Sequence, residues 1–283
     1  MKGVLASPPG SPGIAPLPAL ADAQAEADAP VRLTRLAVDS TSAHLVRHVW
    51  IPRWRLLPGV VVEQAALDYP SANLVIEADA AALYGPELGR SRQRLEGTGW
   101  AFGALLQPGV ARLLVDGPMR RLIGGSVSID ELRVTDATTL VHDVRSAVSA
   151  GDDDAAVAAF EAWISAQHLV LDRDAKLVRR VVELAEHDRS ILRADDLAVA
   201  SGLGLRRMQR LLRDQLGLTP KWLIRRYRMQ EAAALLAGPA PPPLAELAAS
   251  LGFSDQAHLT REFRAVIGQT PRRYALAAAA AGR

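Results

Sequence analysis

The chain contains no cysteine among its 283 residues, which excludes disulfides, thiolate metal sites, covalent haem attachment and a cysteine nucleophile. Long apolar runs are also absent, because charged residues interrupt each run well before about 18 residues, so no membrane-spanning helix is predicted. Residues 1–30 lack the apolar core of a secretory signal and the arginines of a transit peptide. We therefore expect a cytoplasmic protein without a membrane partner.

Lysine is rare and occurs only at positions 2, 176 and 221, so arginine supplies nearly all of the 33 basic residues. A planar guanidinium group suits phosphate and guanine, although GC-rich coding also raises arginine usage. Residues 1–172 hold 14 basic and 20 acidic residues, a balance of −6, whereas residues 173–283 hold 19 and 11, a balance of +8. This asymmetry predicts that the C-terminal half meets a polyanion and that the N-terminal half has another task.

Composition and periodicity divide the chain into four parts and predict the α+β class. Residues 1–30 are rich in Pro, Ala, Gly and Ser and are predicted to be disordered. Residues 31–150 are predicted to form a β-rich domain, barrel-like or a sandwich, and residues 151–172 a helical linker. Residues 173–283 are predicted to form an all-α domain.

The β-rich prediction is based on short apolar stretches between turn signals over residues 44–135, a spacing typical of barrels and sandwiches. Strands are predicted at Gly59–Gln64, Asn73–Glu77, Phe102–Gln107 and Val110–Val115.

From residue 136 onward, apolar residues recur at helical spacing. Pro220 begins a long helix, since a missing N–H costs little in the first turn, and Gly238 with the proline cluster at 239–243 ends it. The predicted helices cover residues 136–150, 152–167, 174–188, 195–201, 205–216, 220–237, 244–250, 255–266 and 271–281.

The C-terminal half contains an internal repeat. Each copy predicts a short helix, a turn with glycine and a longer helix, which is the outline of a helix-turn-helix unit. Two copies with the same anchors are stronger evidence than one. The matching anchors are Leu197-Ala198 with Leu247-Ala248, Gly202 with Gly252, Gly217 with Gly268, and Thr219-Pro220 with Thr270-Pro271.

The stretch LAASLGFSDQAHLTREFRAVIGQTPRRY at 247–274 resembles the signature of the AraC/XylS family of bacterial transcription regulators. The resemblance extends over roughly residues 176–281. It departs from the family pattern at Leu259, commonly an aromatic residue there, and at Ala275, usually an arginine. The resemblance implies two helix-turn-helix units, joined by the long helix, that bind double-stranded promoter DNA.

The N-terminal part more loosely resembles sensor domains attached to such DNA-binding domains. The similarity lies in HVWIPRW at 48–54, YPSANLVIE at 69–77 and GTGWAFGALLQPG at 97–109. Gln107 departs from it, because a basic or aromatic residue usually precedes this Pro-Gly. The resemblance implies a small-molecule or protein effector but names none, and the ligand-binding residues stay unknown.

A recognition helix must place three or four side chains in the major groove and other groups on phosphates. In the first unit the candidates are Arg206, Gln209 and Arg210, with Arg207 and Arg213 near the DNA backbone. Arginine can donate two bonds to guanine, and glutamine can pair with adenine. The alternative is a solvated basic helix face, and the repeat favours DNA contact over it.

The second unit presents Gln256, Ala257, Thr260 and Arg261 on the corresponding face, with His258 beside it. Ala257 could contact a thymine methyl group, and Arg261 could reach a base or a phosphate. Which of these residues reads a base stays open.

Several apolar and aromatic residues are predicted to lie in the core and not in a binding site. Met208, Leu211, Leu212, Leu259 and Phe263 have the spacing of core residues, and Trp222 and Tyr227 are expected to pack the long helix. The aromatic residues Trp50, Trp54, Trp100 and Phe102 either fill the core of the β-rich domain or line a sensor pocket, and a core role is favoured.

Neither a metal site nor a cofactor is predicted. His44 and His48 are four residues apart, but the stretch is predicted to be extended and no third ligand follows. Catalytic motifs, including a nucleophile elbow, a phosphate loop and a dinucleotide fingerprint, are also absent. The chain is therefore predicted not to be an enzyme.

Three hypotheses follow. The first is a transcription regulator whose N-terminal domain senses an effector and whose C-terminal domain binds a promoter, recruiting or excluding RNA polymerase. The second is an enzyme in the β-rich domain, with the C-terminal domain as a DNA-targeting module. The third is an architectural DNA binder with little sequence preference. Residues 31–170 are also a candidate region for forming a homodimer.

Overall fold

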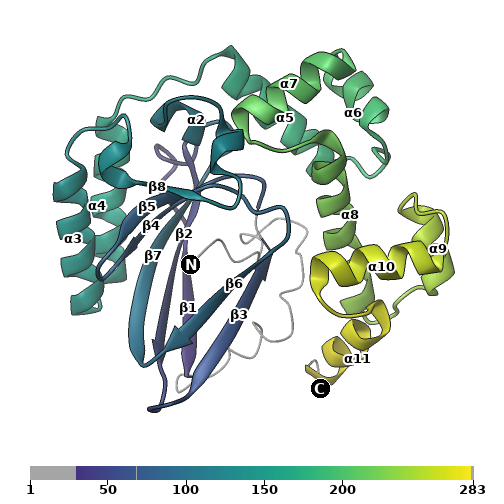
Figure 1. Ribbon diagram of the computed structural model, residues 1–283, viewed down its shortest axis with the longest axis horizontal. Helices are drawn as coiled ribbons and strands as arrows, with labels where there is room; N and C mark the ends of the chain where they lie inside the picture. Colours follow the sequence, from purple (N-terminus) through teal and green to yellow (C-terminus); the bar gives the residue numbers. More distant parts are fainter. Residues whose placement is uncertain (1–29, 68, 282–283) are drawn as a thin grey trace.

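The computed structural model describes residues 30–67 and 69–281. A β-rich N-terminal part is followed by an entirely helical C-terminal part, which confirms the α+β prediction (Figure 1). The segment predicted to be disordered lies outside the described residues apart from Pro30.

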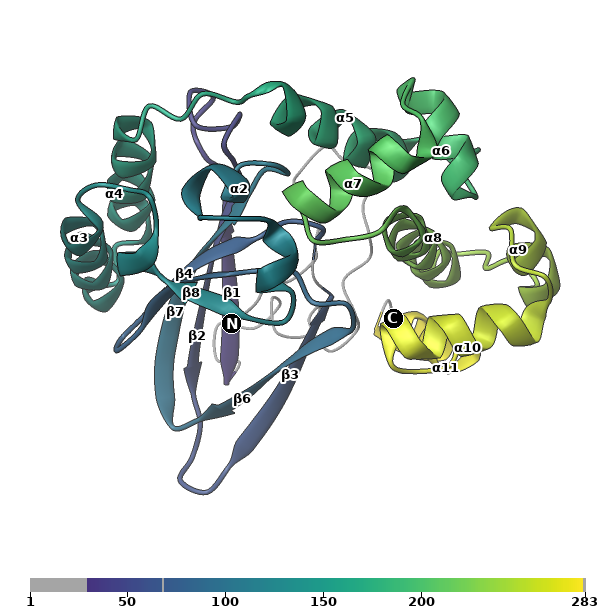
Figure 2. The same cartoon turned by 45° about the horizontal axis from the view of Figure 1, so that its top comes forward.

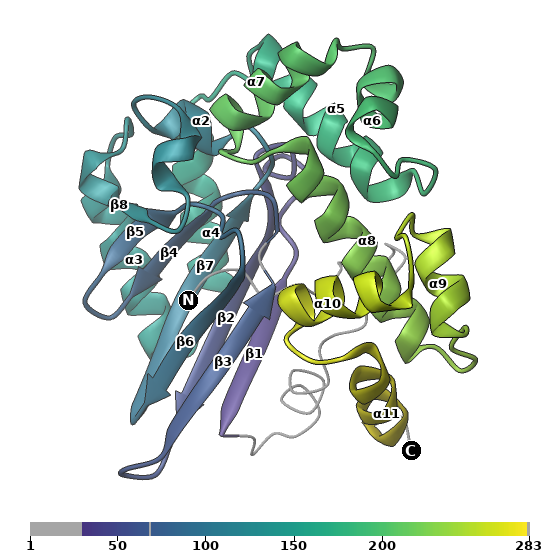
Figure 3. The same cartoon turned by 45° about the vertical axis from the view of Figure 1, so that its right-hand side comes forward.

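The N-terminal part is built on a six-stranded antiparallel sheet in the order β1-β2-β7-β4-β5-β8, with β3 and β6 paired in a separate two-stranded sheet. The two-stranded sheet lies over one face of the larger one (Figure 3). The strands are β1 Val31–Leu36, β2 Val46–Arg55, β3 Val61–Leu67, β4 Asn73–Glu77, β5 Ala81–Tyr84, β6 Arg90–Glu96, β7 Thr98–Leu106 and β8 Ser126–Ser128.

The alternation of side chains along β7 shows how both faces of the large sheet are buried. Phe102 and Ala104 belong to the core that includes Phe160, whereas Ala101 packs in a second core with Trp50. The first core lies under helices α3 and α4, which cover one face of the sheet (Figure 1). The second core lies between the two sheets. This explains why the apolar runs of these strands are continuous.

The favoured core role is confirmed for Trp50 and Phe102, which are fully buried. Trp50 crosses Gly103 on the paired strand, and a Cβ on that glycine would lie 2.1 Å from the indole ring. The indole Nε1 donates a hydrogen bond of 3.1 Å to Oδ1 of Asn73. Trp54 and Trp100 are half-buried and pack against the two cores.

The strand predicted at Val110–Val115 is wrong, because the structure has the short helix α2 at Ala111–Leu114. Gly109 lies in the turn after β7 with a φ of +89°, and a Cβ there would lie 2.9 Å from Cα of Ala175. A short apolar run does not distinguish a buried strand from a buried helix, which explains the error. The turn at Gly109 instead directs the chain into α2, whose Ala111 and Leu114 are buried.

The helices predicted from residue 136 onward are confirmed, each to within one residue at either end. Two 3₁₀ helices, η1 at Met119–Leu122 and η2 at Ile129–Glu131, precede them. The helices are α3 Ala137–Ala150, α4 Asp153–Ala166, α5 Arg173–His187, α6 Ala194–Ser201, α7 Leu205–Gln215, α8 Pro220–Ala237, α9 Leu244–Ser250, α10 Gln256–Ile267 and α11 Pro271–Ala281.

The segment predicted as a helical linker, residues 151–172, contains α4. This helix packs on α3 and contributes Phe160 and Trp163 to the sheet core, so it is part of the N-terminal structure. Asp152 caps it by accepting a hydrogen bond of 2.9 Å from the backbone N–H of Ala155. The limits of the independent domains stay a prediction.

Candidate nucleic-acid interface

The first helix-turn-helix unit consists of α6, a turn and α7. The turn needs the left-handed backbone conformation that glycine adopts without strain, and Gly202 has a φ of +68°. Met208 and Leu212 of α7 are fully buried in the core that this unit shares with α5 and the N-terminal half of α8. The predicted core role of these residues is confirmed.

The second unit, α9 and α10, repeats this construction. Gly252 supplies the turn with a φ of +75°, and Leu259 and Phe263 are fully buried in a separate core. Leu259, where the sequence departs from the family pattern, thus has the core role predicted for it. Asp255 caps α10 by accepting a hydrogen bond of 2.7 Å from the N–H of His258, and this bond lowers the pKa of the Asp255 carboxyl.

The 18-residue helix α8 joins the two units (Figure 3). Its N-terminal half contributes Leu223 and Tyr227 to the first core, and its C-terminal half contributes Met229 and Leu236 to the second. Thr219 caps α8 by accepting a bond of 3.2 Å from the N–H of Trp222. Because one continuous helix carries both cores, the two units are held at a fixed separation.

The exposed side of α7 carries the predicted DNA-contacting residues of the first unit. Arg206, Arg207, Arg210 and Arg213 are exposed, and Gln209 is half-buried. Arg206, Arg210 and Arg213 follow each other at spacings of four and three, so they form a row along one side of the helix. This row is available to a phosphate backbone or to base edges.

The second unit exposes fewer charges. Gln256, Ala257 and Arg261 are exposed, whereas Thr260 and His258 are half-buried. The His258 ring meets the ring of Phe253 edge-on at 5.2 Å, and its Nδ1 lies 3.1 Å from Oγ of Ser254. His258 therefore supports the turn before α10, a role that its predicted place beside the reading face did not include.

The N-terminal part packs on α5 and α8, the two helices that share the core of the first unit. Four side chains make this contact and are here called the interdomain cluster: Arg47, Tyr69, Glu186 and Tyr227. Nη2 of Arg47 lies 2.8 Å from Oε1 of Glu186, and the hydroxyl groups of Tyr69 and Tyr227 donate to Oε2 at 2.8 and 3.4 Å. Arg47 also stacks on the Tyr69 ring, with Cζ 4.1 Å from its centre. Burial raises the pKa of both tyrosines, so they stay protonated donors.

Further contacts surround this cluster. Arg179 of α5 donates a hydrogen bond of 2.6 Å to the carbonyl oxygen of His44. Nε1 of Trp222 donates a hydrogen bond of 2.9 Å to the carbonyl oxygen of Leu88. Tyr69 and Leu105 belong to the core of the first unit. Sequence reasoning missed this interface, because the residues of the cluster are far apart in the chain and lie on different elements.

The C-terminal end of α7 contacts the segment that contains α2 and η1 (Figure 2). Nε of Arg112 lies 3.7 Å from Oδ2 of Asp214. A Cβ on Gly217, whose φ is +76°, would lie 2.7 Å from Cδ1 of Ile123. The first recognition helix is therefore in contact with the N-terminal part at one end.

The two histidines considered as metal ligands do not form a site. His44 is exposed and lies before β2, whereas His48 is buried in β2 with neither ring nitrogen hydrogen-bonded. Burial, followed by the charges of Arg35 and Arg47, lowers the pKa of His48 to about 3. Over residues 30–67 and 69–281, the structure contains no cluster of three or more potential metal ligands. Within the same range, no helix has the length and apolarity to cross a bilayer.

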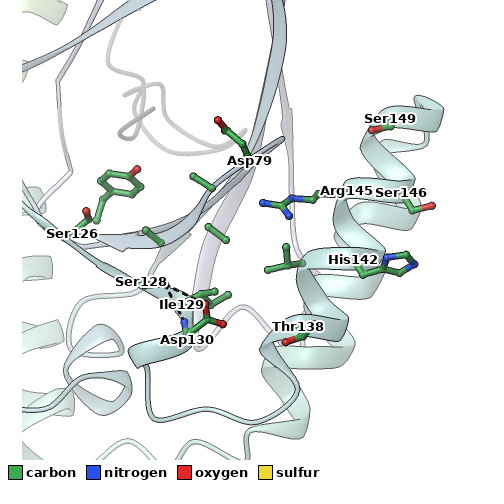
Figure 4. A pocket seen from close by; sticks show the side chains of 15 residues that line it. Asp79, Ser126, Ser128, Ile129, Asp130, Thr138, His142, Arg145, Ser146 and Ser149 are labelled. Carbon is green, nitrogen blue, oxygen red and sulfur yellow. Dashed lines mark hydrogen bonds between the residues drawn. The ribbon is translucent and has the colours of Figure 1, made fainter.

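A groove of about 1100 Å³ lies between α3 and two strands, β5 and the edge strand β8. Arg145 extends from α3 towards Asp79, whereas His142 points away from the strands (Figure 4). Nε of Arg145 donates a hydrogen bond of 2.9 Å to the carbonyl oxygen of Glu77. Ser126, Ser128 and Ser149 also line the groove, together with the apolar side chains of Ile129 and Val141.

The paired cores, the glycine turns and the exposed faces of α7 and α10 define a double helix-turn-helix domain. In agreement, residues 197–277 match the model of a helix-turn-helix domain family. Residues 40–128 match a domain of unknown function, DUF6597, which assigns no activity to the N-terminal part.

Two similar proteins are named as transcription regulators. The chain is 31% identical over 99 residues to the HTH-type transcriptional activator RhaS of Escherichia fergusonii, and the match spans 35% of this chain and 35% of that protein. An AraC-type regulator structure from Chromobacterium violaceum is 26% identical over 37% of this chain and 93% of its own, with a TM-score of 0.34. ToxT of Vibrio cholerae is 12% identical over 87% of this chain and 97% of its own, with a TM-score of 0.39.

Residues 197–277 therefore form a helix-turn-helix domain, and residues 247–274 within it resemble the AraC/XylS family signature. The match to the curated relative covers only about a third of that protein's length.

Proposed function

We propose that the protein is a sequence-specific DNA-binding transcription regulator. Each recognition helix, α7 and α10, enters the major groove, and the two read successive segments on one face of promoter DNA. The observation that carries this proposal is the pair of exposed polar faces held on one continuous helix. At about 1.5 Å per residue, the 18 residues of α8 span roughly 27 Å, compatible with groove segments about 34 Å apart.

The proposed roles follow from side-chain chemistry and exposure. Arg206, Gln209 and Arg210 read bases in the first segment, and Arg207 and Arg213 contact phosphates. Gln256, Ala257, Thr260 and Arg261 act in the second segment, with His258 supporting them from the turn. Because RhaS is named an activator, we propose that this chain also activates transcription, with RNA polymerase as its partner.

The N-terminal part is proposed to bias DNA binding in response to an effector. The groove between α3 and β8 is the candidate site for a small effector, and the interdomain cluster provides a physical connection to the helices that share the core of the first unit. A homodimer formed through residues 31–170 remains a prediction. An enzymatic role has no comparable support from the described side chains.

The experiment that tests the proposal is selection of binding sites from random duplex DNA by the full chain, followed by affinity measurements at several salt concentrations. We expect one enriched site with two specified segments about 10 base pairs apart. Its affinity should fall steeply with salt, since neutralised phosphates release counterions.

If no sequence is enriched although DNA is bound, the protein is an architectural binder. If the folded chain binds no DNA, the proposed function is wrong.

A further inference from the structure

The N-terminal part has a basic edge, despite the excess of acidic residues in the first 172 positions. The 3₁₀ helix η1 carries Arg120 and Arg121 next to each other, and both side chains are exposed. Neither guanidinium forms an ion pair with a carboxylate among the residues that the structure describes. Their charges are therefore available to a ligand of opposite sign.

This basic edge lies against the first recognition helix. Ile123, directly after η1, and the carbonyl oxygen of Met119 both face Gly217, where a Cβ would lie within 2.9 Å of either. Gly217 follows α7 in the turn to α8, so η1 lies at the C-terminal end of α7 (Figure 2).

The side of α7 that meets this segment borders the row of exposed arginines. Asp214, which pairs with Arg112 of α2, follows directly after Arg213, the last residue of the row. At 100° per residue, Asp214 is only about 40° around the helix from Arg210. Arg120 and Arg121 thus stand beyond the end of the row formed by Arg206, Arg210 and Arg213.

The position of the edge is fixed by the packing between the two parts. Glu186 holds both Arg47 and Tyr69 of the N-terminal part, and Trp222 reaches the carbonyl oxygen of Leu88. Tyr69 is buried within the core of the first unit. These contacts are made by three different elements, β2, the loop before β4 and the loop before β6, so η1 cannot swing away without breaking several of them.

From this geometry we propose that Arg120 and Arg121 bind phosphates at the edge of the first groove segment. The N-terminal part is then a component of the DNA-binding surface as well as a sensor. Contacts of this kind fix the position of a protein on the duplex and add affinity without reading sequence. The inference depends on the proposed DNA-binding function.

The test compares the full chain with the double variant Arg120→Ala/Arg121→Ala on the site selected by the wild type. A phosphate contact contributes about 0.9 to the slope of log affinity against log salt concentration. We expect the double variant to lower this slope by about one to two and to keep the same base preferences. Phosphate-ethylation interference should also disappear at the edge of the first segment only.

The matched control is Arg32→Ala/Arg55→Ala, which removes the same charge from exposed positions in the same part. Arg55 ends β2, which begins at Val46, so it lies roughly 30 Å along the strand from the interface. This control should leave the slope at the wild-type value. The variant Arg120→Lys/Arg121→Lys keeps the charges and should restore most of the slope.

If the double alanine variant and the control give the wild-type slope, or if both lower it equally, the proposed contact is wrong while the DNA-binding function stands. If the wild type enriches no DNA sequence, the proposed function fails first, and the selection experiment reveals this independently of the variants.

Discussion

The two helix-turn-helix units have the same local construction but different surroundings. Each has a glycine turn, a buried apolar side of its second helix and an exposed polar side. The first unit shares its core with Tyr69 and Leu105 of the N-terminal part, whereas the core of the second unit is formed by α8 to α11 alone. Among the described residues, no hydrogen bond or ion pair joins residues 244–281 to residues 30–166.

This difference indicates which unit can respond to the N-terminal part. The N-terminal part contacts the end of the first recognition helix at Asp214 and Gly217, and it contacts α5, which packs on that helix, at Glu186. It can reach the second unit only through α8, or through Leu192, whose side chain lies against Gly252 in the turn before α10. We therefore propose that the N-terminal part acts on the first unit, whereas the stability of the second unit depends on its own core.

Among the variants that test this difference between the two units, Glu186→Ala should lower the free energy of unfolding the most. The change leaves Arg47, about four-fifths buried, and two tyrosine hydroxyl groups without their acceptor. Loss of one partner of a buried ion pair costs about 3–5 kcal/mol, and because this pair is partly exposed we expect about 2–3 kcal/mol. Hydrogen exchange should show lower protection in α5 to α7 and unchanged protection in α10.

The matched control lies in the second unit, where Glu262 of α10 pairs with Arg225 of α8. Glu262→Ala should cost about 1 kcal/mol or less and should lower protection in α10 only. Equal loss of protection in both units for either variant would contradict the proposed separation.

Most of the helical half could be predicted from the sequence, because amphipathic spacing, proline starts and glycine ends are local signals. The bounds of α8, α9 and α11 match their predicted ranges at both ends. The interdomain cluster could not be predicted, since Arg47 and Glu186 are 139 positions apart and only the tertiary fold brings them together.

The N-terminal half was less predictable for a physical reason. The central strands β4 and β7 are buried on both faces, so their apolar runs lose the alternation that distinguishes a strand from a short buried helix. Asn73–Glu77 was predicted with the bounds of β4, whereas Ala111–Leu114 was assigned to the wrong type of structure. A DNA-contacting role for Arg120 and Arg121 could not be inferred from the sequence, because it depends on the tertiary contact between η1 and α7.

A second prediction separates backbone strain from contact with the N-terminal part. Gly202 and Gly217 both have positive φ. A Cβ on Gly202 would meet no atom within 4 Å, whereas a Cβ on Gly217 would lie within 2.9 Å of Ile123 and Met119. Gly202→Ala should cost about 1 kcal/mol through left-handed strain alone. Gly217→Ala should cost about 2–3 kcal/mol, because the added methyl group also overlaps Ile123.

Chemical denaturation of the two variants measures this difference directly. If the two variants lose the same free energy of unfolding, the methyl group added at Gly217 does not overlap η1. The proposed contact between η1 and the end of α7 would then be wrong.

A smaller effect is expected from His48, which lies beside Arg47 in β2. Its pKa is about 3 in the folded protein and about 6.5 when unfolded, so only the unfolded chain gains this proton between those values. Stability should therefore fall as the pH falls below about 6.5, by roughly 1 kcal/mol at pH 5.5. His48→Leu removes this contribution and should flatten the dependence between pH 7 and 5.5.

Thermal unfolding of the wild type and His48→Leu at a series of pH values measures this contribution. Hydrogen exchange in α10 should not differ between the two proteins, because no hydrogen bond or ion pair among the described residues joins α10 to His48. Identical pH dependence in the wild type and His48→Leu would show that His48 is not kept neutral by its surroundings.

The central claim is that two recognition helices of one chain read two adjacent DNA segments. It is tested most directly by repeating the selection of binding sites with Arg210→Ala, Arg261→Ala and Arg213→Ala. The account predicts that Arg210→Ala relaxes base preference in the first segment only, with a loss of about 1–3 kcal/mol in binding, and that Arg261→Ala does so in the second. Arg213→Ala should weaken all sequences alike. Unchanged preferences in both segments for folded Arg210→Ala and Arg261→Ala would contradict it.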